Sequence, residues 1–456
     1  MAHNRPQNLH HKMKKVLSAV AALGLVIGLA PTASAVEFKI SGKYLLEGAY
    51  LSDARGTGLD LTEAPGEHTP SDAYFLHTFE IRPAMQVNDK ISMFSTIRLA
   101  DDTFWGNQTG GDTNDLRTTN NFYVHQLYLD YKSPLGKMRL GRVPFELNGT
   151  DFMNFDSRAN QIMWWPKFVD KPWHLLLYTR KNIDKCQATP DASDTDSDAY
   201  IARLCYKTNN LDAGIVRGMI NNKTIATVSD RKQGVVLYGI YKNDENFFIN
   251  SEITHHFGSV KQDATTGLKD RDYDTWSGML QVGGRFEALT PSLMYFYASG
   301  QDRNATAANG GDIENALNNT GSTQGTGDQF EPLYILTGRH TGMLNNDVFS
   351  SGNTTAMSRD GVHGVVLAAD YAVSNRLNLH GAIAWVKADK VNIANKDDEY
   401  GREYNLGAAY NLLDNLTYEA HSGYLDTGDY FKSNAFLNDS QTENVYILTH
   451  SLTMTF

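Results

Sequence analysis

The segment Glu443-Asn-Val-Tyr-Ile-Leu-Thr-His-Ser-Leu-Thr-Met-Thr-Phe456 decides how the rest of the sequence is read. Hydroxyl side chains fill most of one set of alternate positions. The other set is apolar, interrupted only by His450: Tyr446, Leu448, Leu452, Met454 and Phe456. Period-two alternation predicts a β-strand with one apolar face and one face in water. A C-terminal strand of a soluble sheet has the same pattern, so the remainder of the chain must distinguish the two.

A secretory signal peptide is predicted over residues 1–35. The one long apolar run, 16–30, follows Lys12, Lys14 and Lys15, and it precedes Pro31-Thr-Ala-Ser-Ala35. A basic region, an apolar core and an Ala-x-Ala end are typical of such signals, which places cleavage after Ala35. Because Met13 is the more ordinary start, we interpret residues 1–12 as a start-site artefact.

Charge and hydropathy exclude several classes of protein. Cleavage removes four of the 41 basic residues and none of the 52 acidic ones, which leaves a formal charge of −15. This balance argues against a nucleic-acid partner. The mean hydropathy is −0.41, and no second apolar run approaches the ~20 residues of a transmembrane helix. An exported chain of this kind is either soluble or a membrane β-barrel, because only helices and closed barrels satisfy their backbone in lipid.

The alternating pattern recurs along the whole mature chain. It is clearest in segments 37–51, 74–87, 91–99, 276–287, 376–385 and 403–412, and weakest in 160–165. Short turns alternate strictly with long polar loops between about 18 such segments, although 16 remains open. Brief periplasmic turns and longer outer loops are typical of membrane barrels. The sequence therefore predicts an all-β fold over residues 36–456, a transmembrane antiparallel up-and-down β-barrel.

The polar face of the segments is assigned to the lumen. A barrel of this many strands surrounds a space too wide for side chains to fill, so the charged face belongs on water and the apolar face on hydrocarbon. The polar face carries Glu80, Arg82, Arg98, Glu252, Arg285 and Glu419. Aromatic residues near segment ends are candidates for interfacial girdles: Tyr44, Tyr131, Trp173, Tyr206, Trp276, Tyr410 and Tyr424.

Motifs for catalysis or cofactor binding are missing from the sequence. It contains no Gly-x-Ser-x-Gly, His-Glu-x-x-His or Gly-x-x-x-x-Gly-Lys. The acidic stretches 191–198 and 269–274 match no spaced calcium loop. We therefore expect no enzyme activity, no cofactor and no metal site. Cys186 and Cys205 are the only cysteines, and in an oxidising compartment the pair predicts a disulfide.

One stretch carries a family resemblance. His125-Gln-Leu-Tyr-Leu-Asp-Tyr131, the turn Pro134-Leu-Gly136 and Arg139-Leu-Gly-Arg142 lead into a long loop. Here the chain resembles the Gram-negative general porins and, more loosely, the alginate-export-type barrels. The terminal Phe456 is similar to the C-terminal signal by which such barrels are recognised for assembly. Val143-Pro144 departs from the family, where a Gln commonly follows the Leu-Gly-Arg element.

The resemblance implies a constriction site. In porins the third outer loop narrows the barrel, and here it corresponds to residues 144–160, with Glu146, Asp151 and Asp156. Strand parity places arginines opposite it or further round the wall: Arg82, Arg98, Arg139, Arg180, Arg203, Arg217 and Arg285. Arg142 has the opposite parity and faces inward only if the strand bulges. Acidic and basic rows create a transverse field that sets ion selectivity.

We therefore expect a porin in the outer membrane of a Gram-negative bacterium, passing small hydrophilic solutes and ions by passive diffusion. A pore specific for polysaccharide or organic anions is the first alternative, and a barrel enzyme is the second. Expected partners are outer-membrane lipid and lipopolysaccharide, and the resemblance implies a homotrimer. The long loop 301–360 contains an apolar island, Phe330-Glu-Pro-Leu-Tyr-Ile-Leu336, predicted either to plug the mouth or to contact a neighbouring subunit.

Overall fold

A computed structural model describes most of the mature chain. It covers residues 36–52, 54–55, 58–59, 71–105, 122–144, 149–152, 158–169, 171–183, 196–225, 227–243, 246–317, 330–341, 343–344, 359–391, 397–431 and 444–456. The predicted signal peptide lies outside these ranges. Within them no helix is long and apolar enough to cross a membrane.

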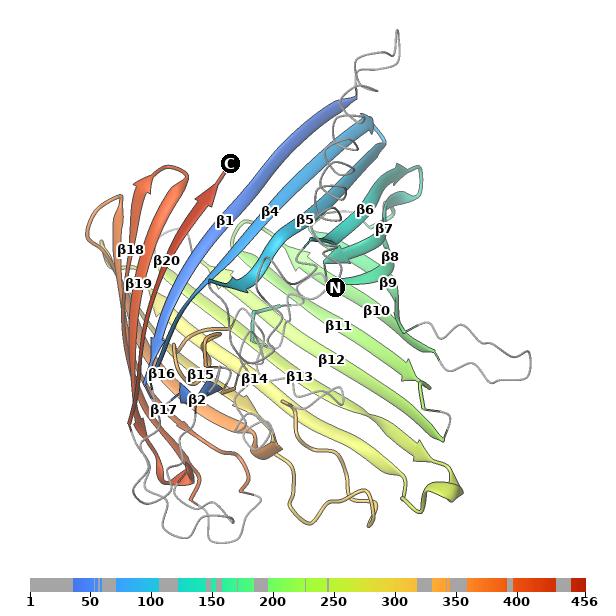
Figure 1. The fold of residues 1–456 in the computed structure, drawn as a ribbon. Coiled ribbons are helices and arrows are strands. Elements are labelled where there is room, and N and C mark those ends of the chain that lie inside the picture. Colours follow the sequence, from blue (N-terminus) through green and yellow to red (C-terminus); the bar gives the residue numbers. More distant parts are fainter. Residues whose placement is uncertain are drawn as a thin grey trace, which may run out of the picture.

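Eighteen strands form one antiparallel sheet that closes on itself (Figure 1). Two further short strands, β2 (Ala54–Arg55) and β3 (Gly58–Leu59), make a separate hairpin. The sheet strands are β1 (Glu37–Leu51), β4 (Asp72–Asn88), β5 (Ile91–Phe104), β6 (Tyr123–Ser133), β7 (Gly136–Pro144), β8 (Arg158–Pro166), β9 (Trp173–Ile183), β10 (Ser197–Lys207), β11 (Leu211–Asn222), β12 (Val228–Lys242), β13 (Phe247–Gln262), β14 (Arg271–Gly284), β15 (Leu289–Ala298), β16 (Val362–Ala372), β17 (Leu377–Lys387), β18 (Glu399–Leu413), β19 (Leu416–Thr427) and β20 (Val445–Thr455).

The last strand closes the barrel, as its sequence predicts. β1 pairs with β4 on one side and with β20 on the other. The backbone N–H of Gly42 donates to the carbonyl of Phe456 at 2.9 Å, and the N–H of Phe456 donates back at 3.2 Å. A Cβ at Gly42 would lie 2.3 Å from the Phe456 ring and 2.6 Å from the Glu80 carbonyl oxygen. Glycine is therefore required at the position of β1 that pairs with the C-terminal Phe456.

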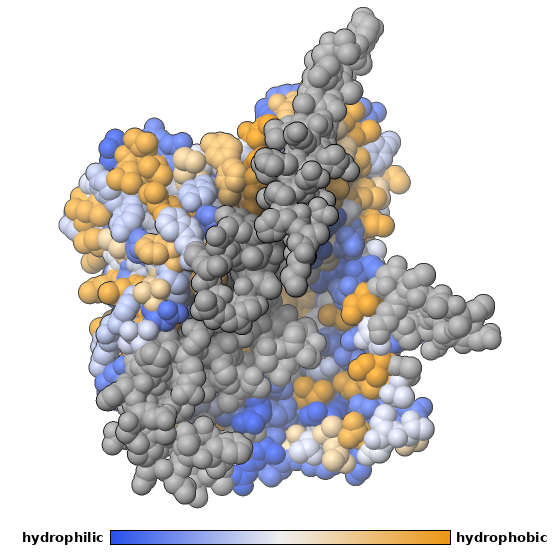
Figure 2. Space-filling model, in the orientation of Figure 1, coloured by the Kyte–Doolittle hydropathy of each residue, from blue (hydrophilic) through white to orange (hydrophobic). Residues whose placement is uncertain are grey.

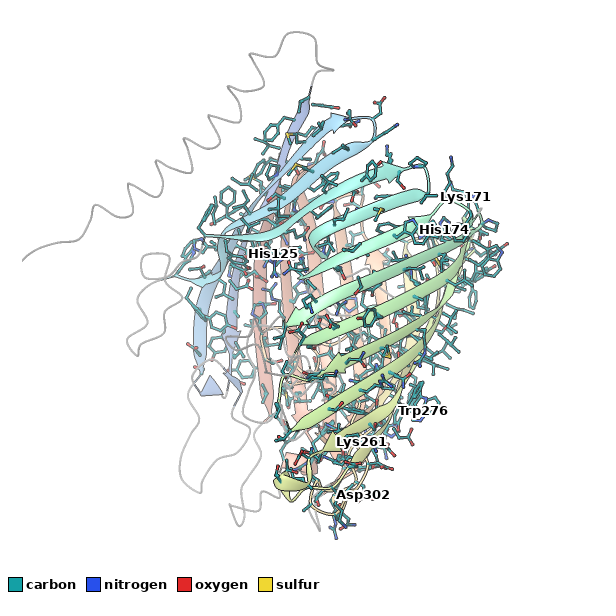
Figure 3. All side chains as sticks on the ribbon, turned by 90° about the vertical axis from the view of Figure 1, so that its right-hand side faces the viewer. His125, Lys171, His174, Lys261, Trp276 and Asp302 are labelled. Atoms are coloured by element: carbon teal, nitrogen blue, oxygen red, sulfur yellow. The ribbon has the colours of Figure 1, made fainter. Side chains whose placement is uncertain are left out.

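The two ends of the barrel differ, which confirms the predicted alternation of turns and loops. Tight turns such as 89–90, 134–135 and 414–415 lie at one end, and the long connections lie at the other. Figure 3 shows Lys171 and His174 near the turn end and Lys261 and Asp302 at the loop end. The strand predicted most weakly, 160–165, is β8.

The outer face of the wall is apolar. Large hydrophobic side chains alternate with buried residues along the strands and remain exposed on the outside, for example Ile40, Leu127, Ile253, Leu367, Leu406 and Leu448. Figure 2 shows hydrophobic residues on the wall of β18 and β19, and mostly hydrophilic ones along the lower edge, at the loop end. Trp276 is exposed and projects from the outside of the barrel (Figure 3). This is the arrangement that a hydrocarbon environment requires of a barrel wall.

The inner face is polar over part of the wall and apolar over the rest. Buried polar side chains point inward from the strands, among them Glu80, Gln161, Glu252, Thr254 and Glu403. A second group of inward residues is apolar and completely or almost completely buried, including Phe296, Val366, Ala384 and Ile447. Apolar groups are buried inside a barrel this wide only if other parts of the chain cover them.

Candidate pore constriction

In the described part of the chain, the connection between β7 and β8 contacts the inner wall of the barrel, and its role as a constriction stays a prediction. Its described part, 149–152, is held by Glu252 of β13, whose Oε2 accepts hydrogen bonds from the Thr150 N–H at 2.8 Å and hydroxyl at 2.9 Å. Gly149 has a φ of +109°, and a Cβ there would lie 2.7 Å from Tyr238 Cβ. Phe152 is 0% exposed. A buried carboxylate in the wall therefore anchors this inward loop.

The loop between β15 and β16 supplies a second inward segment, described over 330–341 and 343–344. Glu403 of β18, itself 0% exposed, accepts hydrogen bonds from the N–H groups of Ile335 and Leu336, both at 2.8 Å. The apolar side chains of Leu333, Ile335 and Leu336 are completely buried. The apolar island therefore packs against the inner wall of its own barrel, and the predicted role as a plug of the mouth stays a prediction.

The two inward segments pack against each other through aromatic rings. Phe152 and Phe330 have centroids 4.9 Å apart, and both contact Phe296 of β15, at 6.0 and 5.3 Å. These rings belong to one large apolar cluster that also contains the inward residues of β15 to β18. Dry packing of this kind excludes water from that side of the lumen. Any aqueous path therefore runs along the remaining wall.

A polar cavity of about 650 Å³ lies on that wall, between β1, β4, β5, β6 and the second inward segment. Serine, threonine and glutamine side chains contribute to its lining, together with Tyr128 and His125. Its charged residues are Lys43, Glu80, Arg82, Arg98, Asp101, Asp102, Arg158 and Arg339. Five of these side chains are basic and three are acidic, so the lining carries a formal excess of positive charge.

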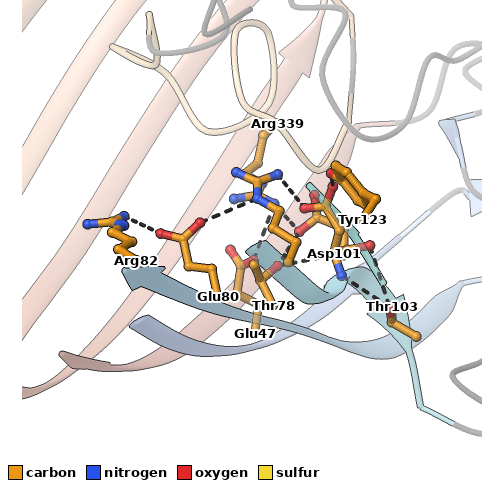
Figure 4. A network of polar contacts seen from close by, with 10 residues as sticks. Glu47, Thr78, Glu80, Arg82, Asp101, Thr103, Tyr123 and Arg339 are labelled. Carbon is orange, nitrogen blue, oxygen red and sulfur yellow. Dashed lines mark hydrogen bonds and ion pairs between the residues drawn. The ribbon is translucent and has the colours of Figure 1, made fainter. Parts of the chain in front are cut away.

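Arg339 links the second inward segment to the cavity wall (Figure 4). Its guanidinium donates to Asp102 Oδ1 at 2.7 Å and lies 3.3 Å from Glu47 Oε2. The neighbouring His340 lies 3.6 Å from Glu47 Oε1 and 3.2 Å from the Tyr74 hydroxyl. Charge-assisted bonds of this type fix geometry because guanidinium and carboxylate groups are directional partners. Arg339 is therefore held at the cavity edge by two strands of the wall.

A second set of polar contacts lies beside Arg339 along β4 and β5 (Figure 4). Arg98 donates to Glu80 at 3.3 Å and also to Asp101, whose other oxygen accepts from the Tyr123 hydroxyl. Arg82 bonds Glu80 from the opposite side. The Arg82 side chain is 52% exposed, whereas Glu80 is 6% exposed. Glu80 is thus set back in the wall and Arg82 is presented to the cavity, where it can meet a negatively charged solute.

The predicted site residues lie in different places. Arg82 and Arg98 line the cavity. Arg139 points inward beside Met163, but it lies near the turn end, where it makes a bidentate pair with Asp130 at 2.7 and 3.0 Å. Asp151 is described and exposed, next to the anchored Thr150. Glu146 and Asp156 lie outside the described residues.

Two arginine assignments are wrong. Arg142 is exposed opposite Leu127 and Asn160, because the register of β7 continues without a shift through this position, and it therefore faces outward. Arg217 pairs with Val235 and shares the outer face of β11 with the exposed Ile215. β11 has apolar residues on both faces, so its alternation did not indicate which side is wet.

Other predicted arginines point inward. Arg180 and Arg203 share the inner parity of β9 and β10 with the buried Tyr178 and Cys205. Arg285 borders a separate depression at the turn end.

The predicted disulfide stays a prediction, because Cys186 lies outside the described residues. Cys205 is buried and pairs with His174, whereas Ser197, at the loop end of β10, pairs with Ile183. The eight residues from Ser197 to Cys205 span ~26 Å of strand, and three residues beyond Ile183 reach at most ~11 Å. A bridge would therefore require Cys186 to reach Cys205 over a distance along the strand that is longer than three residues span.

Several residues of the site were missed at the level of sequence. Asp101 and Asp102 lie beyond the predicted segment 91–99, but β5 continues to Phe104 and carries them into the wall. Glu47 alternates onto the inner face of β1, so the period-two pattern could have placed it in the lumen. Arg339 belongs to an irregular segment, and its position depends on contacts with strands more than 200 residues away in sequence.

Comparison with known proteins finds the fold and no sequence relative. No protein-family model matches the chain, and no curated protein matches it. Solved structures do match: a BenF-like porin from Pseudomonas fluorescens Pf-5, at 12% identity and a TM-score of 0.50, covers 92% of this chain and 99% of its own. Pseudomonas aeruginosa OpdO (11% identity, TM-score 0.51) and OccK8 (11%, 0.51) also cover 92% of this chain, and 97% and 98% of theirs. The chain therefore has the fold of these outer-membrane porins.

Proposed function

We propose that the protein is a porin of the Gram-negative outer membrane, a passive channel for small hydrophilic solutes and ions. The observation that carries the proposal is a closed barrel with an apolar outer wall and a charged cavity inside it. A wall of this kind suits a bilayer. A cavity lined by paired charges suits water and polar solutes. The proposal involves no covalent chemistry and no bound cofactor.

The cavity favours small anions, including organic acids, among such solutes. Two inward segments and their apolar cluster occupy part of the lumen, and a polar cavity lies beside them on the β1–β6 wall. Partial filling of the lumen disfavours polysaccharide, the other cargo considered from the sequence. The basic excess of the lining, together with the exposed guanidinium of Arg82, lowers the free energy of an anion in the cavity. Assembly as a trimer remains a proposal that rests on the resemblance alone.

Reversal potentials in planar bilayers under a salt gradient test the proposal. We expect stepwise conductance and an anion preference in the parent protein. Arg82→Gln combined with Arg98→Gln removes two cavity charges. Each charge contributes on the order of 1 kcal/mol to an ion a few ångströms away, so the anion-to-cation permeability ratio should fall at least ~5-fold. Arg142→Gln is the matched control, because that arginine faces outward. A barrel without conductance, or a ratio unchanged by the double variant, contradicts the proposal.

A further inference from the structure

The outward position of Arg217 is unusual for a barrel wall. Its strand neighbours on the outer face are apolar, and Ile215, Leu237 and Ile253 around it are 44–55% exposed. An arginine on a lipid-facing wall is costly unless it reaches the interface or meets an anion. In the described part of the chain no carboxylate pairs with Arg217, although acidic partners are found for many other cations of the barrel.

The guanidinium of Arg217 is directed toward the loop end of the strands. It donates to the Gly234 carbonyl at 3.2 Å and to the side chain of Gln233, and it lies 4.7 Å from the Phe257 ring centroid. Gln233 and Phe257 pair with each other two residues nearer the loop end than Arg217 itself. A long side chain on an apolar wall lowers the cost of its charge by bending toward the membrane interface.

An apolar groove of about 450 Å³ lies beside Arg217 on the wall of β8 to β11. Ala202 and Gly218 leave room at its floor, and Arg217 is at its margin. Its larger lining residues are Ile162, Leu177, Tyr200 and Met219. Most of the exposed lining is apolar, so the groove suits an alkyl chain. Arg217, which pairs with no carboxylate in the described part of the chain, thus lies at the edge of an apolar groove.

We propose that Arg217 and this groove bind one phosphate-bearing lipid of the outer leaflet, with the phosphate on the guanidinium and Gln233 and an acyl chain over Ala202. Charge complementarity identifies the occupant, since a phospholipid or lipid A carries an anion and an alkyl chain in one molecule. The inference rests on the outward wall facing lipid, which is part of the proposed function. It does not rest on conductance through the lumen.

Lipid binding to the purified barrel in detergent tests the proposal without any transport measurement. Native mass spectrometry would titrate lipid A against its phosphate-free counterpart, with inorganic phosphate as a further arm. We expect Arg217→Gln to weaken lipid A binding at least tenfold and to leave the phosphate-free lipid unchanged. Ala202→Phe should weaken both lipids, and inorganic phosphate alone should not bind.

The control is Arg402→Gln, because Arg402 also faces outward but lies 3.5 Å from Glu399 on the distant wall of β18. It should keep parental affinity. Heat-modifiable migration in gels shows that each variant is folded. Equal lipid A affinity for the parent and Arg217→Gln overturns the proposal. A change in oligomeric mass in Arg217→Gln, with lipid binding unchanged, also overturns it and assigns the groove to a second copy of the chain.

Discussion

Glu403→Ala should release the second inward segment from the barrel wall. The parent carboxylate accepts two backbone N–H groups at 2.8 Å in a fully buried position. Hydrogen bonds to a charged group contribute roughly 1.5–3 kcal/mol each. Alanine leaves both N–H groups without this acceptor, so the docked state loses about 3–6 kcal/mol relative to a displaced one. This corresponds to a change of roughly 10²- to 10⁴-fold in their ratio.

Single-channel recording in planar bilayers measures the effect, because the segment fills part of the lumen. The variant should show a larger conductance and more frequent current steps than the parent at the same voltage. Glu419→Ala is the matched control, since Glu419 also points inward on the next strand, and its hydrogen bond goes to Ser451 of the wall. Parental conductance and noise in a folded Glu403→Ala barrel would refute the assignment of Glu403 as the anchor.

Two further predictions concern closure and pH. Gly42→Val should prevent the folded, heat-modifiable form seen in gels, because even a Cβ lies 2.3 Å from the Phe456 ring; normal migration would show that the terminus can shift. Burial raises the pKa of Asp389, but hydrogen bonds with His363 (3.0 Å) and from the Gly300 N–H (2.8 Å) outweigh it and hold the pKa below its usual value. Its contribution to stability is therefore complete above the unfolded pKa of ~3.9 and is lost as the pH falls through the folded value. Thermal unfolding midpoints of the parent and Asp389→Asn should differ at pH 7 and converge as the pH falls below the usual range of a carboxyl group; a constant difference contradicts this.

The barrel itself could be predicted from local pattern. Period-two alternation assigns residues to faces without any knowledge of the partner strand, and β1 has the predicted bounds Glu37–Leu51. The prediction was wrong where the alternation is weak. In β11, Ile215 and Val216 are both apolar although they lie on opposite faces, so parity could not place Arg217.

The constriction was only partly predictable, because it is built from non-local contacts. Glu252, which holds the described residues next to Asp151, lies about a hundred positions further along the chain. The acids that pair with the cavity arginines come from β1, β4 and β5, whereas the third loop was expected to supply them. No periodicity indicates that Arg339 meets Asp102.

The seam between the first and last strands governs how the molecule can be made. Tyr50 and Tyr446 lie side by side although 396 positions separate them. Joining ends so far apart costs about 4 kcal/mol more loop entropy than closing a four-residue hairpin. The N–H and C=O groups on one edge of β1 therefore stay without their strand partner until β20 has been exported. An incompletely folded chain with such an unpaired strand edge is prone to aggregation, so it must be protected until the strand that ends at the final aromatic residue has paired.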